Sequence, residues 1–148
     1  MSFPGLCGLF KSVIAFPLMA KVYFAAPLFC KAELDFNAHV ADILRNNGHE
    51  VILPQEGMTD GDHIEIFRND LASVDACDTI LFVMDGRVPD EGASFELGYA
   101  YAKGKRCIGL KTDVRVSEKG GDNIMLEGAL SYGVARSIPE LIGMMEGM

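Results

Sequence analysis

The sequence has few of the patterns that mark metal-binding, nucleic-acid-binding or membrane proteins. Its four cysteines form no C-x-x-C pair and have no zinc-finger spacing. Its 13 lysines and arginines are scattered among 21 acidic residues, so the formal net charge is −8. Nucleic acids and anionic membranes bind clusters of basic residues, so this charge argues against both partners. A phosphate on a substrate would have to be held by local groups.

Two nucleotide-binding signatures are also missing. There is no G-x-G-x-x-G after the first predicted strand and no G-x-x-x-x-G-K-[ST] anywhere, so neither dinucleotide nor P-loop chemistry is supported. The three histidines, His39, His49 and His63, lie far apart in the sequence and belong to no obvious ligand set. We therefore expect neither a metal nor a cofactor.

The first 18 residues are apolar but do not resemble a targeting segment. Lys11 interrupts the apolar run, and no basic segment precedes it as in a signal peptide. The run is also too broken for a transmembrane helix, which needs about 20 mostly apolar residues. Met19 opens "MAKVYFAAPLF", which leads directly into a strand. We expect residues 1–18 to be an extension and 19–148 to form the domain. Free, mostly buried cysteines fit a cytoplasmic protein.

The rest of the chain alternates short apolar runs with segments of helical periodicity. Strands are predicted at 22–26, 50–54, 79–85 and 106–111, with a short fifth strand around Val134. Helices are predicted over 31–48, over 63–78 in one piece or two, within 89–106, and from Ser137 onward. This alternation predicts one α/β domain, a flavodoxin-like (Rossmann-like) fold with a doubly wound, parallel sheet of five strands.

Several acids lie at the edge of this sheet where ligands bind, beyond the carboxyl ends of the strands. The segment "PDEGASFELGYAYAKGKR" (89–106) leaves that edge and begins a helix, with Glu96 between two apolar residues in its predicted opening turn. Stabilisation by the helix dipole or by a capping box explains a glutamate there. Alternatively, the small residues 92–94 leave room for a ligand, and Asp85 and Asp90 add further carboxylates to one pocket.

Two other candidates also have structural explanations when each is taken alone. Asp70 could be an exposed helix acid beside Arg68, and Tyr23 a core residue whose hydroxyl finds a partner at the rim. Together, however, four segments resemble the nucleoside 2-deoxyribosyltransferase family in order and spacing. They are "YFAAPLF" (23–29), "FRNDL" (67–71), "DGRVPDEGASFELGYAYAKGK" (85–105) and "NIM" (123–125). The most specific part is D-x-G-x-x-x-E-L-G-Y-A, from Asp90 to Ala100.

This resemblance implies a role for each matching residue. Glu96 resembles the nucleophile that attacks C1′ of deoxyribose, and Tyr23 the tyrosine that orients it. Asp70 and Asp90 resemble the aspartates that contact base and sugar, one of them assisting base protonation. Asn123 and Met125 resemble sugar contacts supplied by a neighbouring subunit, which implies a homo-oligomer. The other implied substrate-binding residues are Ala26, where the family usually has glycine, Phe29, Gly92 and Ser94.

The implied activity is exchange of the base between 2′-deoxyribonucleosides and free nucleobases through a deoxyribosyl–glutamate ester, with no nucleic-acid polymer and no membrane as partner. The alternative is hydrolysis of a deoxynucleoside or its 5′-monophosphate by the same glutamate. The loop "AAPLFCKAE" lacks the serines and arginine of related monophosphate hydrolases, but Lys31 could reach a phosphate. A third hypothesis is a non-catalytic nucleotide-sensing module on the same fold.

Overall fold

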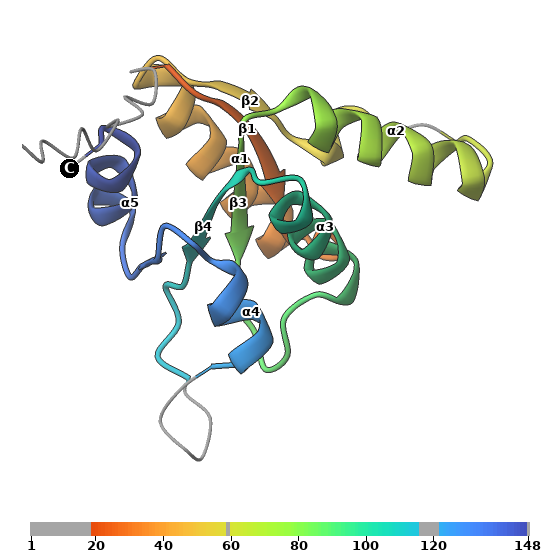
Figure 1. Cartoon of the computed structure of the whole chain (residues 1–148). Helices are drawn as coiled ribbons and strands as arrows, with labels where there is room; N and C mark the ends of the chain where they lie inside the picture. Colours follow the sequence, from red (N-terminus) through yellow and green to blue (C-terminus); the bar gives the residue numbers. More distant parts are fainter. Residues whose placement is uncertain (1–18, 59, 116–121, 148) are drawn as a thin grey trace, which may run out of the picture.

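Strands and helices alternate throughout the computed structural model, which describes residues 19–58, 60–115 and 122–147 (Figure 1). The strands are β1 (Lys21–Ala25), β2 (Glu50–Ile52), β3 (Thr79–Val83), β4 (Arg106–Leu110) and β5 (Val134–Ala135). The helices are α1 (Lys31–Asn46), α2 (His63–Ala76), α3 (Glu91–Ala102), α4 (Ile124–Ala129) and α5 (Ile138–Met145), with a 3₁₀ turn η1 (Pro54–Glu56). The predicted extension over residues 1–18 lies outside the described residues.

The five strands form one parallel sheet in the order β2-β1-β3-β4-β5, which is the flavodoxin-like order. The predicted fold class is therefore confirmed. β1 is an interior strand, and Tyr23 pairs with Ile52 on one side and Ile80 on the other. The strand order reverses between β1 and β3. Ligands of such sheets bind at this point, beyond the strand ends.

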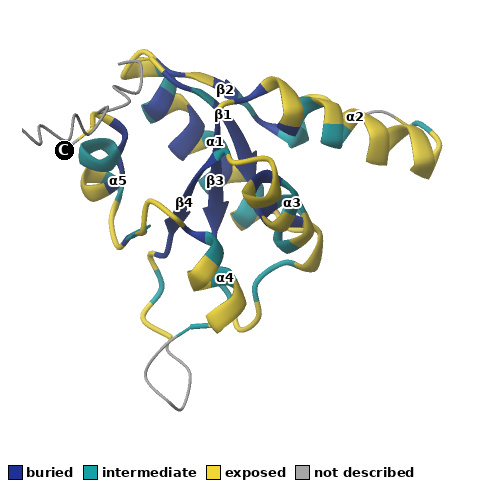
Figure 2. Cartoon of the chain, in the orientation of Figure 1, coloured by how far each residue is buried: buried dark blue, intermediate teal, exposed yellow. Residues whose placement is uncertain are grey.

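Two apolar layers cover the sheet, because side chains of a strand alternate between its faces. Val22 and Phe24 of β1 pack with residues of α1 and α5. Tyr23 and Ala25 face the other way and pack with residues of α2 and α3. Figure 2 shows the buried residues concentrated in the strands between these layers. Tyr23 therefore points to the face that α3 covers.

Helix α1 buries four residues, whereas Val74 is the buried residue of α2. The buried residues of α1 are Asn37, Val40, Ala41 and Leu44. Asn37 tolerates burial because its amide donates to the Pro27 carbonyl at 2.9 Å and to Gln55 Oε1 at 3.2 Å. Helix α2 is continuous, and it extends away from the sheet with most of its surface exposed (Figures 1 and 2).

The cysteines of the described residues are free, and two of them are buried as predicted. Cys77 follows the last turn of α2, and Cys107 lies inside β4, whereas Cys30 is exposed before α1. No helix within the described ranges is long and apolar enough to cross a bilayer.

Candidate active site

The centre of the candidate site is a hydrogen bond between β1 and α3. The hydroxyl of Tyr23 donates to Glu96 Oε1 at 2.7 Å. Ala93, Leu97 and Ala100 of α3 are buried against the sheet, and this packing holds the helix over β1 and β3. The hydrogen bond thus joins residues 73 positions apart at the edge where the fold binds ligands.

Glu96 lies deeper in α3 than the sequence suggested. The helix begins at Glu91, so Glu96 belongs to its second turn, where the helix dipole has little effect. Burial raises the pKa of Glu96 to about 7, the charges of Asp70 and Asp90 also raise it, and the Tyr23 hydrogen bond lowers it. The helix-dipole explanation considered for Glu96 from the sequence therefore does not hold, because Glu96 lies outside the opening turn. Close to neutral pH, this carboxyl group exists in both protonation states.

Asp70 reaches the same region from α2, and burial raises its pKa. It lines a cavity of about 170 Å³ whose other walls are mostly apolar. These walls are Leu28, Pro54, Gly57, Met58, Ile66 and Asn69. An adjoining cavity of about 350 Å³ is lined by both Tyr23 and Asp70. Sequence reasoning missed the apolar walls and Asn69, because they come from separate segments that meet only in the fold.

Asp90 caps the start of α3. Its Oδ2 accepts the backbone N–H of Ala93 at 2.7 Å. The absence of a side chain at Gly92 leaves room for this arrangement, since a Cβ there would lie 3.2 Å from the same oxygen. The charge of Asp90 also raises the pKa of Glu96. Asp90 therefore has a structural role as well as a place in the site.

Two of the predicted substrate-binding residues, Ser94 and Ala26, do not face Glu96 in this chain, and a third, Phe29, is exposed in the loop after β1. The Ser94 hydroxyl donates to the Asp90 carbonyl at 2.6 Å, and Ser94 lies about 160° around α3 from Glu96. Ala26 packs with Val22 and Phe24 in the opposite apolar layer. Phe29 is 79% exposed.

The predicted neighbour-directed residues lie at the start of α4. Asn123 is the N-cap, and its Oδ1 accepts the N–H of Met125 at 2.9 Å. Met125 is 78% exposed and lines, with Ser94 and Tyr101, a cavity of about 410 Å³ between α3 and α4. This cavity lies on the side of α3 that faces away from Glu96. Met125 is thus placed outside the Glu96 site of its own chain.

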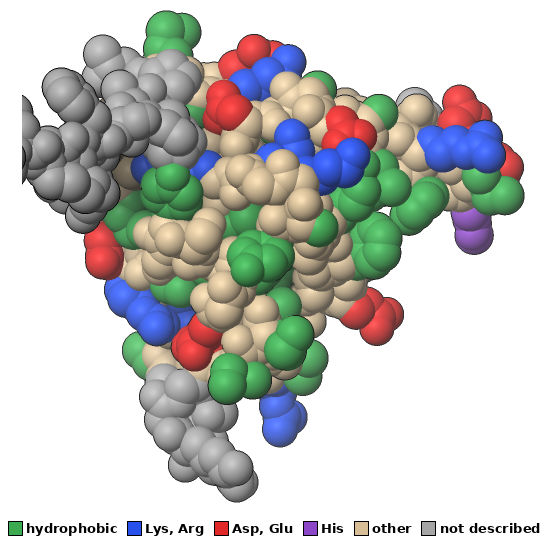
Figure 3. Space-filling model, viewed as in Figure 1, with side chains coloured by type: hydrophobic (Ala, Val, Ile, Leu, Met, Phe, Trp, Pro, Cys, Tyr) green, Lys and Arg blue, Asp and Glu red, His purple; other side chains and the backbone are tan. Residues whose placement is uncertain are grey.

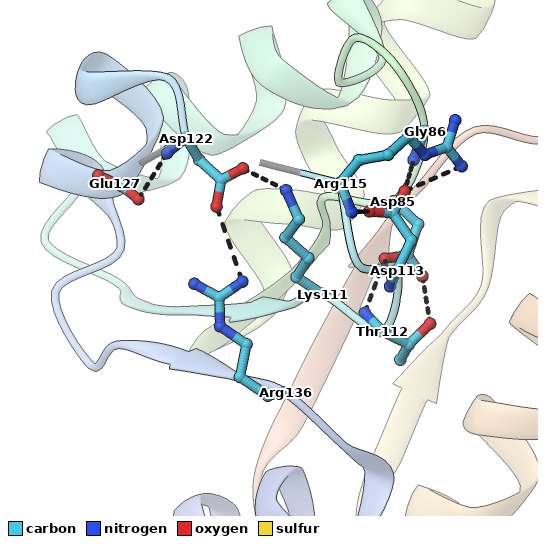
Figure 4. A network of polar contacts seen from close by, with 9 residues as sticks. All are labelled: Asp85, Gly86, Lys111, Thr112, Asp113, Arg115, Asp122, Glu127 and Arg136. Atoms are coloured by element: carbon cyan, nitrogen blue, oxygen red, sulfur yellow. Dashed lines mark hydrogen bonds and ion pairs between the residues drawn. The ribbon is translucent and has the colours of Figure 1, made fainter. Parts of the chain in front are cut away.

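Asp85, which the sequence grouped with the acids of the rim, joins the ends of β3 and β4 (Figure 4). Its carboxylate accepts the N–H and hydroxyl of Thr112 at 2.7 and 2.6 Å, and the N–H of Asp113 at 2.9 Å. In the same network the buried Lys111 pairs with Asp122. These contacts give Asp85 a structural explanation and fix the segment next to Asn123.

The arrangement combines two features suited to substitution chemistry. A carboxyl group with a pKa near 7 is oriented by a tyrosine, and a second acid, Asp70, whose charge raises that pKa, lines a mostly apolar cavity. Such a pair can divide the roles of nucleophile and proton donor. Within the described ranges, no three His, Cys, Asp or Glu side chains converge as metal ligands.

The sequence profile of the nucleoside 2-deoxyribosyltransferase family matches residues 22–130, a range that includes Tyr23, Asp70, Asp90 and Glu96. The chain belongs to this family. No curated protein sequence matches it significantly.

Solved structures share the fold. A conserved protein from Enterococcus faecalis V583 is 27% identical with a TM-score of 0.77, and the match covers 86% of this chain and 98% of that one. The 2-deoxyribosyltransferase of Bacillus psychrosaccharolyticus is 23% identical with a TM-score of 0.69, over 83% and 90% of the two chains. The CMP N-glycosidase of Clostridium botulinum is 20% identical with a TM-score of 0.56, over 83% and 96%. The family's fold thus extends over nearly the whole length of these proteins.

Proposed function

We propose that this protein exchanges the base of 2′-deoxyribonucleosides for a free nucleobase through an ester between deoxyribose and Glu96. The observation that carries the proposal is the Tyr23–Glu96 hydrogen bond beside Asp70, in a chain of the nucleoside 2-deoxyribosyltransferase family. A carboxylate of this kind stabilises the positive charge that develops on the sugar as the glycosidic bond breaks.

The first half of the reaction breaks the bond between C1′ and the base nitrogen. The bonding electrons leave with the base, and a carboxylate oxygen of Glu96 forms the new bond to C1′. Tyr23 holds Oε1, so we assign the attack to Oε2. In the second half, a nitrogen of the incoming base attacks C1′ and the ester bond breaks. This sequence divides one difficult displacement into two easier ones.

The proton that the departing base needs is assigned to Asp70. Burial raises its pKa, so its protonated form is more available than that of an exposed aspartate. The cavity that Asp70 lines has apolar walls, including Leu28, Met58 and Ile66, that suit a flat aromatic base. When the second base attacks, the same carboxylate takes up the proton that this base releases.

The functional unit is proposed to be a homo-oligomer in which Asn123 and Met125 complete a neighbour's site. Large apolar side chains are exposed on α2, α3 and α4, and Figure 3 shows hydrophobic groups gathered at the surface over these helices. They include Ile64, Ile66, Phe67, Phe95, Tyr101 and Ile124. Exposed apolar patches of this kind mark protein–protein contacts. A second copy would bury this surface and bring its α4 toward the Glu96 site.

The test is a base-exchange assay with deoxyinosine and free adenine, followed by chromatography. The proposal predicts deoxyadenosine and hypoxanthine as products. Glu96→Ala should lower the rate by several orders of magnitude while deoxyinosine still binds, and Glu91→Ala, in the exposed first turn of the same helix, should remain active. Mass spectrometry of quenched wild-type protein should find the deoxyribosyl group on the peptide that contains Glu96.

Three outcomes would replace the proposal. Free deoxyribose with no new nucleoside would assign hydrolysis. Binding of nucleoside without turnover would assign a sensing role. A sugar ester on another residue would remove Glu96 as nucleophile.

A further inference from the structure

The cavity assigned to the base contains an amide side chain that the proposed reaction does not use. Asn69 precedes Asp70 in α2, and both residues line the cavity of about 170 Å³ and the adjoining one of about 350 Å³. The residues of α2 that line these cavities follow the spacing i, i+3, i+4, i+7, so they share one face of the helix. They are Ile66, Asn69, Asp70 and Ser73. A carboxamide therefore lies next to the acid assigned as proton donor.

The Asn69 carboxamide is not held by the protein, in contrast to other amides nearby. Asn37 donates to the Pro27 carbonyl at 2.9 Å, and Gln55 donates to the Leu34 carbonyl at 2.9 Å. No residue in the described part of the chain makes a hydrogen bond with the Asn69 side chain. Its N–H groups and its oxygen are thus all available to a ligand in the cavity, and the amide can turn to present either.

Other polar groups of the two cavities are less suited to reading a base. Among their described lining residues there is no lysine, arginine or histidine, so recognition there depends on hydrogen bonds. The Glu56 carboxylate, at the edge of the larger cavity, is paired with Arg45 at 2.7 Å. Ser73 lines only the larger cavity, one turn further along α2. Asn69 is left as the uncharged polar side chain of α2 that lines both cavities with Asp70.

Base exchange requires one cavity to hold two different bases in turn. The exocyclic group of adenine or cytosine is an amine, which donates, whereas that of hypoxanthine or thymine is a carbonyl, which accepts. A side chain with only acceptors would leave a carbonyl base unpaired, and such a mismatch is strongly rejected. A carboxamide that turns by 180° pairs with either group. Because Asn69 and Asp70 are consecutive, they reach the same edge of a base that lies between the cavity walls.

We propose that Asn69 is a specificity-determining residue whose carboxamide pairs with the exocyclic group of the base. Its freedom to turn lets the same site accept both amino and carbonyl bases. This inference rests on the proposed function, in which the base lies against Asp70 and receives a proton from it.

The experiment lets deoxyadenosine and deoxyinosine compete for one acceptor, 6-methylpurine, at pH 8. The measured quantity is the ratio of kcat/KM for deoxyadenosine to kcat/KM for deoxyinosine, from the adenine and hypoxanthine released. Asn69→Asp keeps the size of the side chain but has only acceptors, so it should raise this ratio about tenfold or more, which corresponds to about 1.4 kcal/mol. Asn69→Leu should lower both values about tenfold and change the ratio by less than about threefold.

The matched control is Asn46→Asp, which makes the same change at an exposed position at the end of α1, far from these cavities. Both of its kcat/KM values and their ratio should equal those of wild type. An unchanged ratio in Asn69→Asp, or full activity in Asn69→Leu, would overturn the role of Asn69. A wild type that uses only one of the two nucleosides would overturn the claim that the site accepts both classes.

Direct binding separates a failure of this inference from a failure of the proposed function. Calorimetry with free adenine and free hypoxanthine involves no sugar and no turnover. Wild type should bind both bases, Asn69→Asp should favour adenine about tenfold more than wild type does, and Asn69→Leu should bind both about tenfold more weakly. The same relative affinities in all three proteins would overturn the inference. A wild type without base exchange, but with the expected binding differences, would overturn only the proposed reaction.

Discussion

The hydroxyl of Tyr23 donates a hydrogen bond to Glu96 Oε1 across the interface between β1 and α3, at 2.7 Å. Burial at this interface raises the pKa of both side chains. The pKa of Glu96 rises to about 7, and that of Tyr23 rises well above its ordinary value because of burial and the nearby Glu96 charge. Tyr23 therefore remains a protonated donor throughout the pH range of Glu96 titration, and it stabilises the ionised form of Glu96.

Tyr23→Phe should shift the pH dependence of the exchange reaction. The substitution removes a hydrogen bond that lowers the Glu96 pKa, so the acidic limb of kcat/KM should move up by about one pH unit. At pH 6.5 we expect kcat/KM to fall by about 10- to 100-fold, with a smaller loss at pH 9. The phenyl ring still fills the core, so the melting temperature should change little.

The matched control is Tyr99→Phe. Tyr99 lies in α3, and its hydroxyl donates to Asp75 at 2.9 Å. Its pH profile should equal that of wild type. An acidic limb that stays in place in Tyr23→Phe would show that Tyr23 does not tune Glu96.

Glu96→Gln should make the protein more stable at alkaline pH. Because the folded-state pKa is about 7 against an ordinary 4.5, the unfolded chain loses this proton first, and wild-type stability falls as pH rises between those values. Above pH 7 the cost of the buried charge is complete. The variant should then exceed wild type by about 1–3 kcal/mol in the free energy of unfolding, and the difference should vanish below pH 4.5.

Urea unfolding followed by circular dichroism at pH 4, 6 and 8 measures this difference directly. Glu91→Gln, an exposed change in the same helix, should show no such pH-dependent gain. A gap between Glu96→Gln and wild type that is constant with pH would contradict the raised pKa.

The fold could be predicted because β1, β3 and β4 are almost entirely buried and so appear as short apolar runs. All five residues of β3 are buried, and the sequence from Ile80 to Met84 is a continuous apolar run. Helix α4 could not be predicted in the same way, since it has six residues and too few turns to show a periodicity. Its start depends on the Asn123 cap, and its position depends on contacts with α3.

The site residues could be named from motifs, but their environment could not. That Tyr23 and Glu96 would meet followed from the family resemblance, whereas the Glu96 pKa depends on how α2 and α3 exclude water from it. Asn37 was not noticed, because a polar residue on the buried side of a helix makes sense only once its partners at Pro27 and Gln55 are known.

Subunit mixing should reveal whether Asn123 serves a neighbouring site. Asn123→Ser keeps an N-cap oxygen for α4 while removing the side-chain amide nitrogen. Alone, this variant and Glu96→Gln should each have little exchange activity. When the two are unfolded together and refolded, sites that combine an intact Glu96 with a neighbour's intact Asn123 should restore about a quarter of wild-type activity for a pairwise, two-fold arrangement.

In the control, each variant is refolded separately and the two are then mixed under conditions in which subunits do not exchange. This mixture contains no mixed oligomers and should stay inactive. Circular dichroism of Asn123→Ser should match wild type, which separates a lost contact from a lost helix. A mixture with no more activity than its components would contradict site sharing, and sedimentation showing an active monomer would do the same.

Lys111→Met should destabilise the fold by leaving a buried acid without its partner. Lys111 and Asp122 have side chains only 5% and 11% exposed, and breaking a buried pair by removing one member costs about 3–5 kcal/mol. Arg136, 3.7 Å from Asp122, should retain part of the stabilisation, so we expect the lower end of that range. Replacing both members, as Lys111→Met with Asp122→Leu, should recover much of the loss, because no unpaired charge then remains buried.

The control is Lys31→Met, which breaks an exposed pair with Asp35 and should change the free energy of unfolding by less than about 0.5 kcal/mol. Urea titration of all four proteins tests the set. If Lys111→Met and Lys31→Met lose equal stability, the buried pair does not anchor this edge of the sheet. If the double variant is no more stable than Lys111→Met, the loss comes from packing at position 111 and not from the isolated Asp122 charge. If the results are as expected, the Lys111–Asp122 pair holds the end of β4 next to the residue that precedes Asn123. The pair then also fixes where α4 begins, so this stability measurement bears on the proposed shared site.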